Sequence, residues 1–117
     1  MEQRSAVRKL AGIGAVVSCP QFGLFRGEIE NVSMQGVYVR TRNVQMCLNA
    51  PVTVTFQPEP AMPLLSCNAE GVVVHQGPNG FGIHFCAMDS VCRAALSNLL
   101  QRLPEAPQAD GPRVMAG

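Results

Sequence analysis

Short strand-like segments follow one another along most of this chain, with no helical segment between them. Their residues are β-branched, or alternate between apolar and polar as in a strand with one buried face. The segments comprise residues 13–19, 21–31, 37–41, 52–56, 64–75 and 81–85. About six consecutive strands without crossover helices predict a mainly β fold, either an antiparallel barrel or a sandwich.

The hydrophobic period changes near the C-terminal end. Apolar residues recur at three- and four-residue spacing from Cys92 to Leu103, which predicts one helix with Asp89 or Ser90 as its N-cap and Pro104 as its end. We expect this helix to plug an open end of the barrel or to cover a sheet edge. Residues 1–11 are predicted to form a flexible arm, residues 12–103 the barrel with its helix, and residues 104–117 a disordered tail.

Length and charge limit the functions that this chain can have. A chain of 117 residues is about one domain, so a second catalytic domain is excluded. No apolar run approaches the ~20 residues of a membrane span and no hydrophobic signal segment is present, which predicts a cytoplasmic protein. The net charge of +1 argues against a DNA- or RNA-binding protein. Six basic and three acidic residues fall within the first 42, and this local excess suits a small anion.

Residues with catalytic or metal-binding potential are dispersed. The five cysteines include no C-x-x-C pair, so neither a zinc site nor a thioredoxin-type site is predicted. Without a secretory signal a disulfide framework is not expected, and we interpret the cysteines as core or near-surface thiols. His75 and His84 are the only histidines, and no Ser-His-Asp or Cys-His spacing accompanies them. We therefore predict no catalytic site, no metal and no cofactor.

Two motifs remain, and each taken alone is weak evidence of function. Arg4 and Arg8 form an R-x-x-x-R pair in the predicted arm, and Asn31, Ser33 and Gly36 form an N-x-S-x-x-G turn between the second and third strands. Paired arginines usually lie on a solvated face, and Asn, Ser and Gly are ordinary turn residues. Their order, their separation and the β-rich context make the combination more specific.

With these motifs the sequence resembles the PilZ domain family of bacterial cyclic di-GMP receptors. The resemblance extends from residue 4 to about 103 and includes residues 37–39, 70–74 and 80–85. It implies a six-stranded antiparallel barrel with a C-terminal helix. It also implies that the arginine pair clasps the ligand against the barrel, where the N-x-S-x-x-G turn supplies the other half of the site.

The residue types suit a ligand with two phosphates and two guanines. An arginine forks onto guanine O6 and N7, pairs with phosphate or stacks on a base, and we expect Arg4 and Arg8 to act in these ways. Asn31 and Ser33, two residues apart, are expected on one strand face, where they contact the ligand's polar edges. Gly36 is expected to let the backbone turn and to keep a side chain away from the ligand.

The resemblance also predicts a stand-alone receptor that acts through a separate partner protein. Motility, exopolysaccharide synthesis, adhesion and virulence all remain open as outputs, and so do ligand stoichiometry and the choice between monomer and homodimer. The alternative is a PilZ-fold protein-interaction module that binds no nucleotide and serves pilus assembly or motility. A small thiol enzyme is a third class, which thiol reactivity in the folded protein would reveal.

Overall fold

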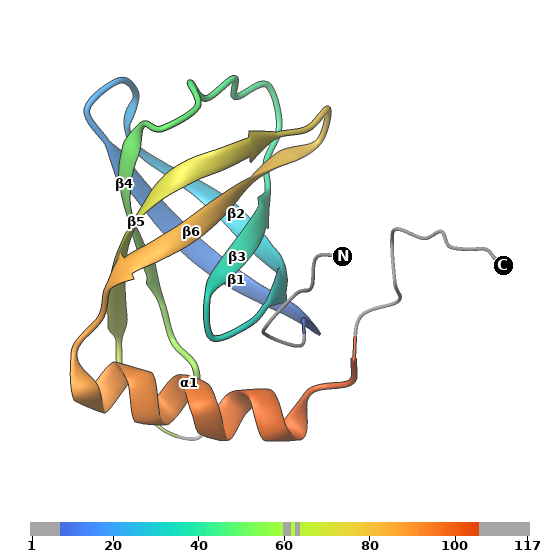
Figure 1. The fold of residues 1–117 in the computed structure, drawn as a ribbon, viewed down its shortest axis with the longest axis vertical. Coiled ribbons are helices and arrows are strands. Elements are labelled where there is room, and N and C mark those ends of the chain that lie inside the picture. Colours follow the sequence, from blue (N-terminus) through green and yellow to red (C-terminus); the bar gives the residue numbers. More distant parts are fainter. Residues whose placement is uncertain (1–7, 60–61, 63, 106–117) are drawn as a thin grey trace, which may run out of the picture.

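The computed structural model describes residues 8–59, 62 and 64–105. These residues form six strands and one helix, shown in Figure 1. In chain order the elements are β1 (Lys9–Cys19), β2 (Gly23–Val32), β3 (Gly36–Arg40), β4 (Pro51–Phe56), β5 (Cys67–Gln76), β6 (Gly80–Ala87) and α1 (Ser90–Arg102). The predicted succession of six strands followed by one helix is confirmed.

The six strands form a closed barrel in the order β1-β2-β3-β6-β5-β4. Every neighbouring pair is antiparallel, and pairing of β1 with β4 completes the circle. Closure decides between the two predicted architectures in favour of a barrel. It also leaves no open sheet edge for a helix to cover.

The helix α1 lies across one end of the barrel (Figure 1). Asp89 caps it by accepting a 2.8 Å hydrogen bond from the backbone N–H of Cys92. This backbone bond, with further bonds from the Cys92 thiol and the Val91 N–H, lowers the pKa of the Asp89 carboxyl. The buried helix residues Cys92, Leu96, Leu99 and Leu100 belong to the same core as the barrel interior. The helix therefore plugs the barrel end, which is one of the two arrangements predicted for it.

The core is mainly aliphatic. Its largest fully buried side chains are Phe81, Ile29 and Leu96, and most of the others are valines from the inward faces of the strands. Three cysteines (Cys19, Cys67 and Cys92) are buried, whereas Cys47 and Cys86 are exposed. Burial, together with the neighbouring Cys92, raises the pKa of the Cys67 thiol to about 12.

The structure moves two predicted boundaries. β1 begins at Lys9, so residues 9–11, expected in the arm, form the start of a strand. They are held by distant partners, because Leu10 donates a 2.8 Å hydrogen bond to the carbonyl of Pro104 and Lys9 forms a β-bridge with Glu105. Pro104 and Glu105, expected in the tail, therefore contact the barrel. Residues 1–7 of the predicted arm and 106–117 of the predicted tail lie outside the described residues.

Local deviations from the predicted strands have simple causes. Gly12 has a φ of +68° where the pairing of β1 with β2 shifts register, so it occupies a bulge that favours glycine. The segment predicted to begin at Leu64 forms a strand only from Cys67, and the side chain of Leu64 is 98% exposed. The predicted 77–80 turn is confirmed by a 2.8 Å bond from the Gly77 N–H to the Gly80 carbonyl.

Candidate functional site

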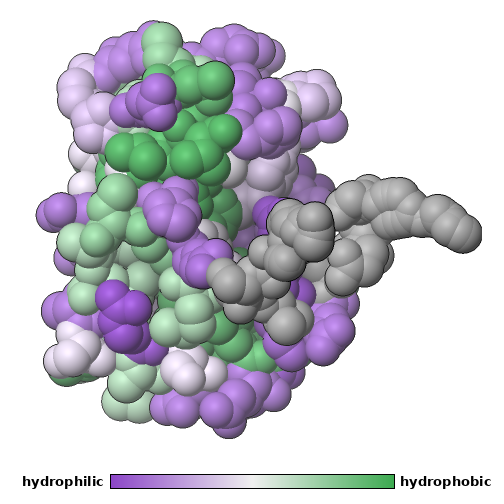
Figure 2. Space-filling view, in the orientation of Figure 1, coloured by the Kyte–Doolittle hydropathy of each residue, from purple (hydrophilic) through white to green (hydrophobic). Residues whose placement is uncertain are grey.

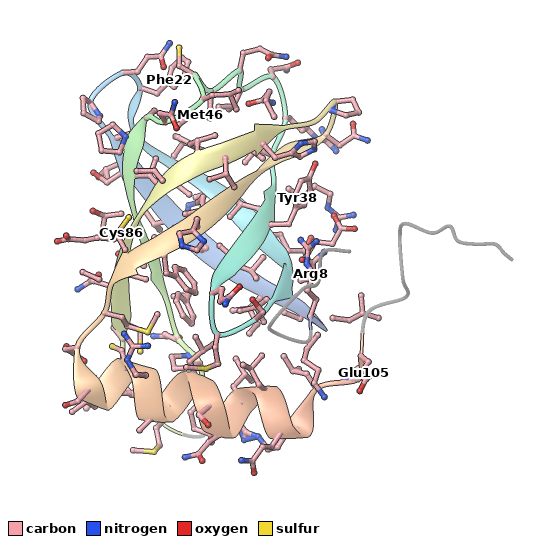
Figure 3. All side chains as sticks on the ribbon, in the orientation of Figure 1. Arg8, Phe22, Tyr38, Met46, Cys86 and Glu105 are labelled. Carbon is pink, nitrogen blue, oxygen red and sulfur yellow. The ribbon has the colours of Figure 1, made fainter. Side chains whose placement is uncertain are left out.

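An open groove of about 690 Å³ lies on the outer face of β2, β3, β6 and β5. Four of the five residues predicted for the site line it: Arg8, Asn31, Ser33 and Gly36. Figure 3 places the labelled Arg8 and Tyr38 on the same side of the barrel. Arg4, the fifth predicted residue, lies outside the described residues. The groove volume is within the range of ~300–1,000 Å³ that is usual for small-molecule sites.

Arg8 and Asn31 join the two sequence motifs across the barrel surface. The guanidinium Nη2 of Arg8 donates a 2.8 Å hydrogen bond to Oδ1 of Asn31, across 23 residues of sequence. The pairing of β1 with β2 explains this proximity, because Leu10 lies opposite Asn31. Both side chains contact solvent, and this bond engages one of the five N–H donors of the guanidinium. Arg8 can therefore offer further donors to an acceptor in the groove.

Ser33 organises the turn that follows β2. Its hydroxyl oxygen accepts hydrogen bonds from the backbone N–H groups of Gln35 (3.0 Å) and Gly36 (3.3 Å), and its own N–H donates to the Gly36 carbonyl (2.9 Å). Both acceptor positions of the buried hydroxyl are thus used, and its proton remains to be donated. β2 ends at Val32, so Ser33 follows the strand instead of sharing a strand face with Asn31 as predicted.

Of the two roles predicted for Gly36, the turn does not by itself require glycine, and the structure adds a further constraint. Among the described glycines only Gly12 and Gly23 have a positive φ, so turn geometry does not demand glycine at position 36. The constraint is the neighbouring strand β6: a Cβ on Gly36 would lie 2.2 Å from the carbonyl oxygen of Ile83. Close approach of two backbones therefore excludes a side chain here.

Aromatic residues of the groove were not predicted as site residues. Tyr38, His75 and His84 all line it, together with the carboxylate-bearing Glu30. Burial, and secondarily the charge of Glu30, raises the pKa of the Tyr38 phenol. The alternation of β3 placed Tyr38 on the outward face, but nothing local indicated that β5 would bring His75 beside it.

A second arginine at the groove is engaged in an ion pair. Arg40 on β3 pairs with Glu28 on β2, its cross-strand partner, and this contact raises the pKa of the guanidinium. The two side chains are 53% and 42% exposed, and Arg40 is the last residue of β3, so it is a solvated residue at a strand end. An exposed pair of this kind contributes little to stability. Arg8, in contrast, has no carboxylate partner among the described residues.

A comparison with models of known protein families assigns this chain to a family. The family model of the PilZ domain matches residues 2–102. The chain belongs to the PilZ domain family. PilZ domains are a family of cyclic di-GMP-binding modules and are generally non-catalytic receptors or effectors. A comparison with curated protein sequences gives no match.

Solved structures show the same fold. This PilZ domain is similar to the Bacillus subtilis inhibitor of motility (MotI/DgrA), with a TM-score of 0.68 and 15% identity over 87% of this chain. It spans about half (52%) of that protein. It is also similar to the PilZ domain of CeSA from a cellulose-synthesizing bacterium, with a TM-score of 0.63 and 14% identity over 80% of this chain and 94% of the other. At these identities the likeness establishes the fold.

Two further properties concern the described residues alone. They contain no group of three or more His, Cys, Asp or Glu side chains arranged to hold a metal ion. Within the same residues no helix has both the length and the apolar character needed to cross a bilayer.

Proposed function

We propose that this PilZ domain is a non-enzymatic receptor for cyclic di-GMP. The observation that supports the proposal most directly is the hydrogen bond between Arg8 and Asn31. It brings the end of the R-x-x-x-R motif to the start of the N-x-S-x-x-G turn, at an open groove of suitable volume.

Each motif residue has a role that follows from its chemistry. Arg8 binds a phosphate, whose charge makes it a stronger acceptor than the neutral Asn31 amide, or the O6 and N7 edge of a guanine, which accepts two hydrogen bonds from one guanidinium. Arg4, four residues earlier in the sequence, binds the ligand with it, as the family resemblance implies. Asn31 then binds a polar edge of the ligand, and Ser33 donates its remaining hydroxyl proton. Gly36 keeps the floor of the groove free of side chains.

The signal passes from the ligand to a separate protein. Binding fixes the arm that carries the two arginines against the barrel, and this changes the surface that a partner meets. Motility is one candidate output, since one structural neighbour is titled an inhibitor of motility. Exopolysaccharide synthesis, adhesion and virulence remain the other candidates.

Isothermal titration calorimetry tests the receptor function. We expect saturable binding of cyclic di-GMP at micromolar concentration, and none of GTP or cyclic di-AMP at that concentration. Arg8→Ala should weaken binding about tenfold or more, because a charged hydrogen bond contributes ~1.5–3 kcal/mol. Arg93→Ala is the matched control, since Arg93 is an exposed arginine of α1 outside the groove.

One result would contradict the role proposed for Arg8, and another would contradict the receptor function itself. Unchanged affinity of Arg8→Ala would remove Arg8 from the site. Absence of saturable binding by the wild-type protein would replace the receptor function with the alternative, a PilZ-fold interaction module that binds no nucleotide.

A further inference from the structure

Four residues form one row across the outer face of the barrel. Asn31 of β2 lies opposite Tyr38 of β3, Tyr38 lies opposite Gly82 of β6, and Gly82 lies opposite His75 of β5. Neighbouring strands are about 4.8 Å apart, and directly opposed residues point to the same face. The Tyr38 ring is therefore one strand away from the amide that Arg8 holds.

Three glycines make room for the Tyr38 ring. A Cβ on Gly77 would lie 2.7 Å from the phenol oxygen, one on Gly80 would lie 3.0 Å from Cε2, and one on Gly82 would lie 3.9 Å from Cδ1. The ring therefore extends along the β5–β6 hairpin from Gly82 to Gly77. A side chain at Gly77 would collide with the phenol and one at Gly80 would crowd the ring, so these two glycines leave the space that the ring occupies.

His75 stands beside the Tyr38 ring on the other side of Gly82. The two ring centroids are 6.3 Å apart with an interplanar angle of 42°. A Cβ on Gly82 would lie 3.5 Å from the Cβ of His75, so the two rings border a position without a side chain. Val74, 54% exposed, extends the apolar surface of the groove. Figure 2 shows hydrophobic residues gathered on the face that carries β5 and β6.

We propose that Tyr38, with His75 beside it, is a stacking platform for one base of the bound cyclic dinucleotide. The proposal rests on the receptor function above and adds residues that neither sequence motif contains. Aromatic side chains bind nucleotide bases through their ring faces, often next to a basic group that holds the phosphate. Here Arg8 is that basic group. The Tyr38 phenol is neutral at physiological pH, as tyrosines ordinarily are, so it does not repel the phosphates.

The composition of the chain makes this contact directly observable. Tyr38 is the only tyrosine and no tryptophan is present, so the tyrosine ring resonances in a proton NMR spectrum belong to Tyr38 alone. A stacked guanine shields the protons of the ring beneath it. We expect an upfield shift of the Tyr38 resonances that saturates at the same ligand concentration as the calorimetric titration of the wild-type protein.

Substitution measures the contribution of the ring. Tyr38→Leu keeps an apolar cover over the glycines without a flat face, and we expect about a fivefold to hundredfold loss of affinity, the range for base–aromatic stacking. Tyr38→Phe keeps the face and should bind within about twofold of wild type. If Tyr38→Leu does not fold, the NMR shift of the wild-type protein and the affinity of Tyr38→Phe still test the stacking platform.

The outcomes separate this inference from the receptor function. Saturable binding with a shifted Tyr38 ring and a weakened Tyr38→Leu variant supports the platform. Saturable binding without a Tyr38 shift, or with full affinity in Tyr38→Leu, overturns the platform and leaves the receptor function in place. Absence of saturable binding by the wild-type protein overturns both.

Discussion

Replacing Gly36 by alanine should destabilise the barrel whether or not ligand is present. The new Cβ would lie 2.2 Å from the Ile83 carbonyl oxygen, and contacts below 3.0 Å force a neighbour to shift. The neighbour is backbone, so β3 and β6 must separate. One hydrogen bond to β6 lies at this point, from the Phe85 N–H to the Gln35 carbonyl (2.8 Å). Overpacking costs about 1–3 kcal/mol and the weakened bond about 1 kcal/mol, so we expect a loss of about 2–4 kcal/mol.

Thermal and urea denaturation, followed by circular dichroism, measure this loss. For a domain of this size it corresponds to a melting temperature lower by about 10–25 °C. Gly82→Ala is the matched control in the same β3–β6 ladder, because its Cβ meets no atom closer than 3.5 Å and its stability should stay within about 1 kcal/mol of wild type. A Gly36→Ala protein as stable as the control would refute the close-approach argument. The role of Gly36 would then lie at the ligand alone.

Three further predictions concern the helix and the thiols. Leu96→Ala should lower the free energy of unfolding by about 2–5 kcal/mol in urea denaturation, whereas Val91→Ala on the exposed side of α1 should have little effect. Asp89→Ala should lower the melting temperature by a few degrees, and Asp89→Asn, which keeps an acceptor, by less. The carboxylate's contribution is present above pH 3.8 and is lost as the pH falls through the lowered pKa, so wild type and Asp89→Asn should converge in acid. In a thiol-labelling assay the two exposed cysteines should react quickly in the folded protein, and Cys67 and the other two buried thiols only after denaturation; fast labelling of all five would contradict the packing of the core.

The sequence predicted the fold well because its elements are encoded locally. Each strand segment is β-branched or alternates over its own length, and the 77–80 turn contains its own Gly and Pro. The N-cap Asp89 directly precedes α1, and Pro104 follows shortly after it. Where the prediction failed, the determinant was distant in sequence. Lys9 and Leu10 belong to β1 because they pair with Val32 and Asn31 of β2, and Pro104 and Glu105 pair with them as well. No pattern within 1–11 contains that information.

In the candidate site, too, local motifs could be predicted and contacts between distant residues could not. The motif residues could be named from spacing and resemblance, but Tyr38 and His75 meet only through the register of three strands (β3, β6 and β5) and a bulge between Val73 and His75. A bulge of one residue reverses the face on which every later side chain lies. The position of His75 therefore required the three-dimensional structure.

The residues of the two motifs carry different information about function. Ser33 and Gly36 are constrained by the barrel itself, through the Ser33 hydroxyl bonds within the turn and the approach of β6 to Gly36. A PilZ domain that had lost its ligand would still need them to fold. Arg8 and Asn31 are partly solvated and are bonded to each other, and neither contributes to the core. An intact turn is therefore weak support for nucleotide binding, and Arg8, which lines the groove, is the stronger support.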